Sequence, residues 1–200
     1  MSAGYLIRLE AKTGKEANIE RILQNTLARV QQEPGIIAWF AFRLGPSTFG
    51  IFDVFRDEQA LQAHFSEEAL ARMQEADELL AQPRIMEKID ILAAKLPKER
   101  EGNMVTKGFL IRYEVKPGNE ADAERAPQKA LPAIQEEPAT IAWFAIRLGP
   151  STFGVFDVFP DEEGRQAHWS ARAAQLQRPE FVENSLVVEK VDVVAARLPG

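Results

Sequence analysis

The sequence predicts an α+β chain made of two similar halves, each with the element order β-α-β-β-α-β. Three observations support this prediction. The seventeen residues WFAFRLGPSTFGIFDVF that begin at Trp39 recur as WFAIRLGPSTFGVFDVF from Trp143, 104 positions later. The similarity extends upstream, where GYLIRLEAKTGKEA from Gly4 matches GFLIRYEVKPGNEA from Gly108. Within one half, apolar residues alternate first with the period of a strand and then with that of a helix.

The first elements follow directly from these periods. Alternating apolar and polar residues over 5–11 predict a strand, and apolar residues at helical spacing over 19–30 predict an amphipathic helix that Pro34 ends. Residues 36–44 and 48–55 are rich in aromatic and β-branched residues, and the turn sequence GPST separates them. This pattern is typical of a β-hairpin.

Two short helices and a last strand complete the half. Asp57 is placed to cap a helix that runs through Phe65, and Ser66 is placed to cap another that runs toward Leu80. Residues 85–92 predict the final strand. This order folds as a four-stranded sheet with its helices on one face, which leaves an apolar face to be covered. The second half supplies an equivalent sheet, so we expect two ferredoxin-like halves packed sheet to sheet.

The repeat also predicts the domain boundaries. We expect the first half over residues 1–96, a polar, charged linker over 97–107, and the second half over 108–200. The first helix of the second half contains Pro127 and Pro132. Because an interior proline costs a helix about 3 kcal/mol, we expect this helix to be kinked or shortened and the two halves to differ in function.

The composition excludes several classes of protein. The 200 residues are 46% apolar and 27% charged, as in an ordinary globular chain. The absence of cysteine excludes disulfides, thiolate catalysis and cysteine-based metal or cluster sites. The net charge of −6 argues against nucleic acid as a partner, and no apolar run approaches the roughly 18 residues that span a membrane. We therefore expect a cytoplasmic protein that binds neither nucleic acid nor membranes.

Asp53 and Asp157 are the first candidates for chemistry, because each interrupts an otherwise apolar strand. A buried carboxylate without partners costs several kcal/mol or loses its charge. A three-residue hairpin loop would pair Trp39 with Asp53 and place Arg43 on the same face, whereas a four-residue loop would separate Asp53 from both. The loop length stays open at this point. So does the simpler interpretation that Asp53 caps or bridges at a sheet edge.

His64 and His168 are the two histidines of the chain and occupy the same place in the two halves. Histidine changes charge near neutral pH, so it is the natural general acid or base. The alternative is a packed histidine hydrogen-bonded to the backbone. Because the two lie in separate halves, they do not make an ordinary zinc site, which takes three or four ligands from one neighbourhood. We expect no metal.

The chain also resembles a known family. The element order, the EPG before the second strand and the run DEQALQAH that ends at His64 are similar to the antibiotic biosynthesis monooxygenase family of dimeric α/β barrels, over nearly the whole chain and twice. The resemblance implies tandem ferredoxin-like domains that form an intramolecular dimeric α/β barrel, a fused pseudo-dimer that could pair further as a homodimer. The best-known oxygenases of the family hydroxylate polycyclic phenols or quinols without metal or flavin, so we expect no cofactor.

The family's own motif residues do not carry over to this chain. Heme-degrading relatives need a histidine on the later helix, and Gln74 stands near that place, which disfavours heme degradation. The phenol oxygenases carry a tryptophan, an asparagine and a tyrosine where this chain has Phe55 and Phe159, Ile51 and Val155, and Leu61 and Arg165.

Three functions are consistent with these residues. The first is a cofactor-independent monooxygenase of a small aromatic phenol or quinol; the second is a small-ligand binding or isomerase-like member of the same superfamily; the third is a non-catalytic structural or regulatory protein. An open cleft lined by Trp39 and His64 would weaken the third, and a closed core around Trp39 would exclude the others. The candidate residues are His64, His168, Asp53 and Asp157 for catalysis, and Trp39, Arg43, Trp143 and Arg147 for binding the small aromatic molecule.

Overall fold

The computed structural model describes residues 3–97, 104–176, 182 and 185–199. The predicted element order is confirmed in both repeats, with the helical segment after the hairpin split into two helices in the first repeat and continuous in the second. Residues 98–103 of the expected linker lie outside the described residues. The elements are β1 (Ala3–Glu10), α1 (Glu16–Val30), β2 (Ile36–Arg43), β3 (Thr48–Phe55), α2 (Glu58–His64), α3 (Glu67–Asp77), β4 (Ile85–Lys95), β5 (Lys107–Glu114), α4 (Glu120–Gln135), β6 (Ala142–Arg147), β7 (Thr152–Phe159), α5 (Glu162–Leu176) and β8 (Val187–Arg197).

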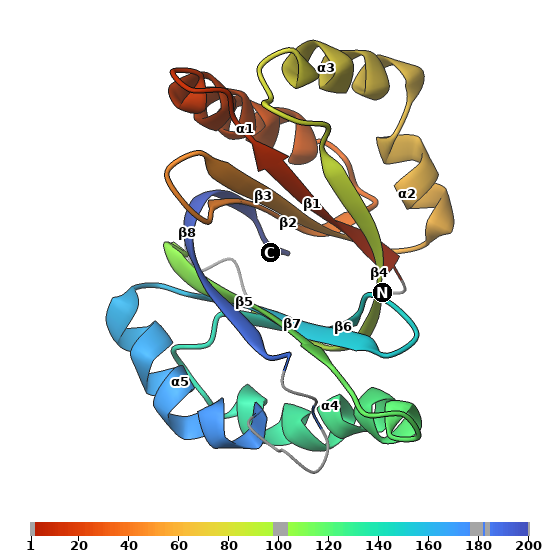
Figure 1. Cartoon of the computed structure of the whole chain (residues 1–200), viewed down its shortest axis with the longest axis vertical. Helices are drawn as coiled ribbons and strands as arrows, with labels where there is room; N and C mark the ends of the chain where they lie inside the picture. Colours follow the sequence, from red (N-terminus) through yellow and green to blue (C-terminus); the bar gives the residue numbers. More distant parts are fainter. Residues whose placement is uncertain (1–2, 98–103, 177–181, 183–184, 200) are drawn as a thin grey trace. The chain divides into compact units, whose positions relative to one another are not determined.

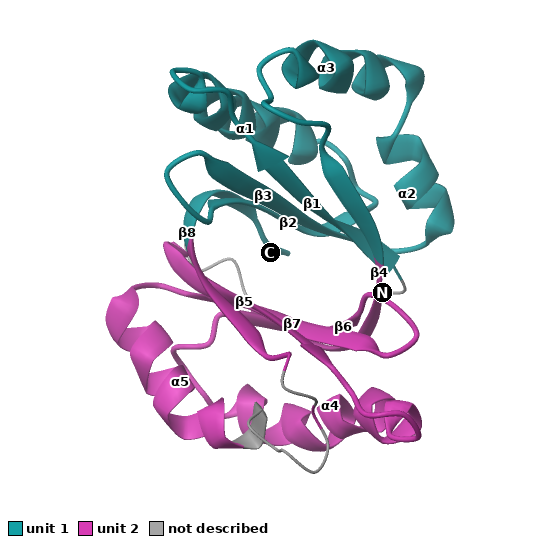
Figure 2. Cartoon of the chain, in the orientation of Figure 1, with its two compact units in different colours: residues 1–88, 192–199 teal, residues 89–191, 200 magenta. Residues whose placement is uncertain are grey.

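The chain divides into two compact units, coloured separately in Figure 2. Unit 1 is Met1–Lys88 with Asp192–Pro199, and unit 2 is Ile89–Val191 with Gly200. β4 and β8 each begin in one unit and end in the other. The two units therefore do not coincide with the two repeats, because each unit receives the end of the other repeat's last strand.

The sheets are antiparallel in every pairing with a defined register. In unit 1, β3 lies between β1 and β2, and β2 also pairs with the part of β8 from Asp192 onward. In unit 2, β7 lies between β5 and β6, and β6 also pairs with the part of β4 from Asp90 onward. The complete hydrogen-bonded order, β1-β3-β2-β8-β5-β7-β6-β4, is closed. The predicted fold class, two ferredoxin-like repeats with the strand order of a dimeric α/β barrel, is confirmed.

In each unit the helices cover one face of the sheet, as Figure 1 shows. In unit 1, the apolar stripe of α1 packs on this face, with Ile19 and Leu23 buried against Trp39. Residues that point to the opposite face, such as Phe40 and Phe52, are fully buried as well. Burying one large apolar side chain stabilises a fold by about 1.5–3 kcal/mol, which explains why the strands read as nearly continuous apolar runs.

The two predicted helix caps in unit 1 are confirmed. The Asp57 carboxylate accepts a hydrogen bond from the Ala60 amide at 2.8 Å, and the Ser66 hydroxyl accepts one from the Ala69 amide at 3.3 Å. Such caps satisfy backbone donors that the first turn of a helix leaves free. They therefore account for the break between α2 and α3.

The proline-containing helix α4 is not shortened, which removes one of the two outcomes expected for it. It spans 16 residues, against 15 for α1. Pro127 is buried in the packing of unit 2, whereas Pro132 is exposed. Burial of the Pro127 ring offsets part of the free energy that is lost with the hydrogen bond the proline removes, since tertiary packing supplies most of the stability of a helix.

The hairpin between β2 and β3 has the three-residue loop, one of the two alternatives that the sequence leaves open. Trp39 pairs with Asp53, and the Leu44 amide donates to the Thr48 carbonyl at 2.9 Å. The hydroxyls of Ser47 and Thr48 both donate to the carboxylate of Glu10 at the end of β1. The same contacts recur in the second repeat between Glu114 and the equivalent serine and threonine. The repeated GPST sequence therefore anchors the hairpin to the neighbouring strand.

Candidate active site

Asp53 lies in β3, at the middle of the sheet of unit 1 rather than at an edge. Its side chain is 1% exposed, and its Oδ1 accepts a hydrogen bond from the Tyr5 amide at 2.7 Å. Its Oδ2 is buried and has no hydrogen-bond partner among the described residues. The interpretation of Asp53 as a bridge at a sheet edge is therefore wrong, because β1 and β2 flank it on both sides.

The environment of Asp53 favours its neutral form. Burial raises the pKa of this carboxyl to about 7, against the opposing effect of the Tyr5 amide, and the negative charge of Glu33 raises it further. A carboxyl with this pKa exchanges its proton near neutral pH, which is what general acid-base catalysis requires. Perturbed carboxyls of this kind are concentrated at functional sites.

His64 is the last residue of α2, and its ring is held by a carboxylate. Its Nδ1 lies 2.7 Å from Glu33 Oε2, and the ring packs beside Phe55 with centroids 5.2 Å apart. The alternative of a histidine bonded to the backbone is therefore wrong. When the Nδ1 proton is donated to Glu33, Nε2 of the neutral ring is left as the proton acceptor.

A cavity of about 490 Å³ lies between the sheet and the helices of unit 1. Trp39, Asp53 and His64 all line it, among apolar side chains such as Ile7 and Leu23. Ligand pockets of globular proteins have about this volume and this mixture of an apolar wall with few polar groups. A cavity lined by Trp39 and His64 weakens the hypothesis of a purely structural hairpin.

Arg43 shares the face of Trp39 and Asp53 but is turned to the end of the hairpin. Its guanidinium lies 4.9 Å from the centroid of the Phe49 ring and donates to the Pro46 carbonyl at 3.2 Å. Arg147 makes the equivalent contacts in the second repeat. Neither arginine is among the described residues that line the cavities. The structure thus brings together Trp39, Asp53 and His64, without Arg43.

Unit 2 has a corresponding cavity of about 660 Å³, lined by Trp143, Asp157 and His168. Here the histidine lies between two carboxylates. Its Nδ1 is 2.6 Å from Glu137 Oε2, and its Nε2 is 3.2 Å from Asp157 Oδ2, an ion-pair distance without the alignment of a hydrogen bond. Asp157 Oδ1 accepts from the Phe109 amide at 3.1 Å.

This contact makes the two cavities electrostatically different. Burial alone would lower the pKa of His168, but the Asp157 and Glu137 carboxylates outweigh it and raise this pKa. The pKa of Glu137 is lowered, because hydrogen bonds from His168, Thr140 and Arg172 together outweigh burial, which is the largest single influence and acts in the opposite direction. The cationic form of His168 is thereby favoured, whereas Asp53 in unit 1 has no such ion pair among the described contacts.

Glu33 and Glu137, which hold the two histidines, were missed by reasoning from the sequence. A signal existed, because both precede a proline at the same place in the two repeats. Their role depends on proximity between the end of the first helix of a repeat and the later helix, which no local pattern reveals.

The described residues contain neither a metal-binding group nor a membrane-spanning helix. Over these residues, no group of three or more histidine, aspartate or glutamate side chains is arranged to hold a metal ion. Over the same part of the chain, each helix is too short or too polar to cross a lipid bilayer.

Comparison with known proteins agrees with this description. Over residues 4–76 the sequence matches the family model described as antibiotic biosynthesis monooxygenase. A comparison with curated proteins gives no match.

Three solved structures are similar over nearly the whole chain. A candidate monooxygenase from Fusobacterium nucleatum is 17% identical with a TM-score of 0.85, covering 100% of this chain and 95% of its own. A candidate monooxygenase from Lactobacillus acidophilus is 14% identical with a TM-score of 0.83, covering 100% and 98%. An anthrone oxidase-like protein is 14% identical with a TM-score of 0.64, covering 98% and 92%. At these identities the likeness shows the fold alone. The family match shows that residues 4–76 form a domain of the antibiotic biosynthesis monooxygenase family, as the sequence resemblance predicts for the first repeat.

Proposed function

We propose that unit 1 binds a small aromatic phenol or quinol in its cavity and oxidises it with molecular oxygen, as a cofactor-independent monooxygenase. The observation that carries the proposal is Asp53, a buried carboxyl with a pKa of about 7 whose Oδ2 is without a hydrogen-bond partner in the described structure. It lines an apolar cavity together with Trp39 and His64. The similarity to an anthrone oxidase-like protein supports the same class of substrate.

The chemistry needs a base because a phenolate reduces oxygen far better than a neutral phenol. A phenol has a pKa of about 10, so transferring its proton to a group with a pKa of about 7 costs about 4 kcal/mol, a modest part of an enzymatic barrier. Phenol and O₂ then give a quinone and water. One oxygen atom becomes the new carbonyl, the other leaves in water with two hydrogens of the substrate, and the substrate supplies all four electrons.

The three candidate residues of the cavity have distinct proposed roles. Asp53 takes the phenolic proton, and the Tyr5 amide holds its other oxygen in place. His64, oriented by Glu33, accepts a proton at Nε2 and passes it onward. Trp39 supplies an aromatic face for the substrate ring. The apolar walls exclude water from the reactive intermediate.

Oxygen uptake by the metal-stripped protein tests the proposal, with hydroquinones, naphthols and anthrones as substrates. The paired variants are His64→Ala and His168→Ala, which change the same residue in the two repeats. We expect substrate-dependent uptake that falls about 100-fold in the first variant, the usual contribution of a side chain that transfers a proton. The second variant should retain most of it. Absence of uptake with every substrate would refute the proposal and favour a small-ligand binding protein.

A further inference from the structure

Two of the arginines that line the cavity of unit 1 are only partly exposed at its wall, with 36% of the Arg29 side chain and 42% of the Arg72 side chain accessible. Arg29 comes from α1 and Arg72 from α3. The Nε of Arg29 is buried, and within the described part of the chain it has no hydrogen-bond partner. It lies 3.8 Å from Glu33 Oε1, a long ion pair, while the other oxygen of Glu33 binds His64. A buried donor without a partner is unfavourable, because it has lost its hydrogen bond to water without gaining another.

Arg29 and Arg72 also repel each other. The pKa of Arg29 is lowered first by burial and then by the positive charge of Arg72, and the Glu33 and Glu68 carboxylates offset this only in part. Arg72 donates to Glu68 Oε1 at 2.5 Å, but 83% of the glutamate side chain is exposed, so water screens this ion pair and it holds the guanidinium weakly. An anion bound between the two guanidinium groups would relieve this repulsion and supply the missing hydrogen-bond acceptor.

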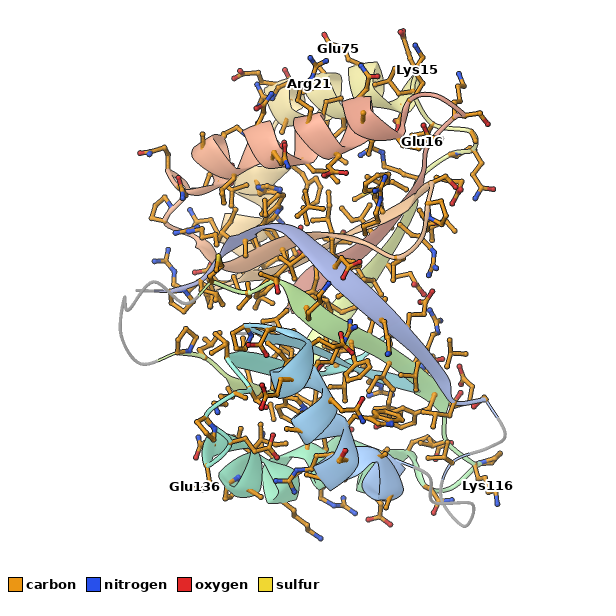
Figure 3. The ribbon with its side chains drawn as sticks, turned by 90° about the vertical axis from the view of Figure 1, so that its left-hand side faces the viewer. Lys15, Glu16, Arg21, Glu75, Lys116 and Glu136 are labelled. Carbon is orange, nitrogen blue, oxygen red and sulfur yellow. The ribbon has the colours of Figure 1, made fainter. Side chains whose placement is uncertain are left out.

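Among the described residues, three other charged groups line the cavity, and they neither neutralise Arg29 and Arg72 nor offer a second site for an anion. Arg84 is already bound, because its Nε donates to Asp77 Oδ1 at 2.7 Å and its Nη2 to the Met73 carbonyl at 2.5 Å. Asp53 is neutral below its pKa of about 7. Glu75 lines the cavity but is exposed, on the outer side of unit 1 (Figure 3).

We infer that the aromatic ligand of unit 1 carries a carboxylate, which Arg29 and Arg72 bind while the ring occupies the apolar part of the cavity beside Trp39. The inference rests on the proposed function, since it names the substrate class of the same cavity. Guanidinium groups are suited to this task because their planar donors match the two oxygens of a carboxylate. The ligand class is thus a hydroxylated aromatic acid rather than a neutral phenol.

The cavity of unit 2 provides an internal comparison, because it lacks this pair. The position of Arg29 is taken by Ala133 in the second repeat. Arg172 lines that cavity, but its Nε donates to Glu137 Oε1 at 2.5 Å in a pair whose side chains are only 18% and 19% exposed, so its charge is compensated away from water. Lys129 also lines it as an exposed ammonium group. Selective binding of a carboxylate is therefore assigned to unit 1.

The test compares 1-hydroxy-2-naphthoate with 1-naphthol, which differ only in the carboxylate. Their dissociation constants are measured by titration calorimetry under nitrogen, so that no oxidation occurs. We expect the wild-type protein to bind the naphthoate at least about tenfold more tightly. Arg29→Gln and Arg72→Gln should each abolish most of this preference without changing the affinity for 1-naphthol. Arg21→Gln is the matched control, because Arg21 lies exposed on the same helix, α1 (Figure 3).

Several results would overturn the inference. These are equal affinity for the two probes, no binding of the naphthoate, a preference that survives in both variants, or its loss in Arg21→Gln. Unfolding midpoints of the variants show whether a lost preference reflects a lost fold, and Arg29→Lys should restore part of the preference by restoring the charge. Because binding is measured without oxygen, the two proposals fail separately. A preference without oxygen uptake would refute the monooxygenase function, whereas uptake without a preference would refute only the carboxylate site.

Discussion

Replacing Asp53 with asparagine should stabilise the protein at alkaline pH and change its stability little in acid. The folded protein holds this carboxyl at a pKa of about 7, against an ordinary value of 3.8. A raised pKa means that folding favours the protonated form. The stability associated with the neutral carboxyl is therefore fully present below pH 4 and is lost as the pH rises through 7.

The size of the effect follows from the same two values. Each pH unit between 3.8 and about 7 costs the folded state about 1.4 kcal/mol, so the complete loss above pH 7 is about 4 kcal/mol. Asparagine has the shape of the neutral carboxyl and keeps an oxygen to accept from the Tyr5 amide. The free energy of unfolding of Asp53→Asn should thus exceed that of the wild type by about 4 kcal/mol at pH 8.5 and by less than about 1 kcal/mol at pH 4.

Urea unfolding of both proteins at these two pH values measures the difference. Asp157→Asn is the matched control, because Asp157 occupies the same place in the second repeat but faces His168 at 3.2 Å. Burial raises the pKa of Asp157 as well, but the contact with His168 acts in the opposite direction, so Asp157→Asn should gain less stability at pH 8.5 than Asp53→Asn does. A loss of stability in Asp53→Asn at pH 8.5, or a gain of equal size at both pH values, would refute the reasoning.

Three further predictions concern the scaffold around the site. Gly50→Ala should destabilise by about 1–3 kcal/mol in urea unfolding, because the new Cβ would lie 2.3 Å from the buried Phe42 ring; Gly45→Ala, where the nearest atom is at 3.6 Å, should cost less. Ser66→Ala should cost about 1 kcal/mol by the same measurement, and Ser66→Asp should retain the cap of α3. Arg43→Gln should leave oxygen uptake within about twofold of the wild type, because the guanidinium packs on the hairpin. A decrease of about 100-fold, comparable to the loss of a catalytic base, would show that Arg43 belongs to the site.

The element order could be predicted because it depends on local periodicity. The alternation in β1, the apolar stripe of α1 and the capping residues Asp57 and Ser66 are each visible within a few residues. The strand exchange between the two units could not be predicted, since it depends on where β4 and β8 pair along their length.

The site could be predicted only in part, because its geometry depends on one loop length. Trp39 and Asp53 face each other only with a three-residue hairpin loop. The hydroxyls that anchor this loop bind Glu10, which is 37 and 38 residues away in sequence. Glu33 likewise meets His64 across 31 residues. Contacts of this kind arise from tertiary packing and have no local signature.

The difference between the two sites illustrates the same limit. The hairpin sequences around Asp53 and Asp157 are almost identical, yet the first carboxyl has a free oxygen in the described structure and the second faces a histidine. Around His168, Thr140 and Arg172 both donate to Glu137. The equivalent positions in the first repeat are Ile36 and Glu68, which lack these donors. Substitutions outside the repeated stretch thus distinguish the two histidines.

The central claim is that Asp53 acts as the base in the oxidation of a phenol within unit 1. It is tested most directly by oxygen-electrode rates of Asp53→Asn and Asp157→Asn at pH 8, with the same naphthol or anthrone substrate. We predict uptake of one O₂ per substrate in the wild type, a decrease of about 100-fold or more in Asp53→Asn, and retained uptake in folded Asp157→Asn. Undiminished uptake in Asp53→Asn would contradict the assignment of the base, and no uptake in the wild type would contradict the proposed function itself.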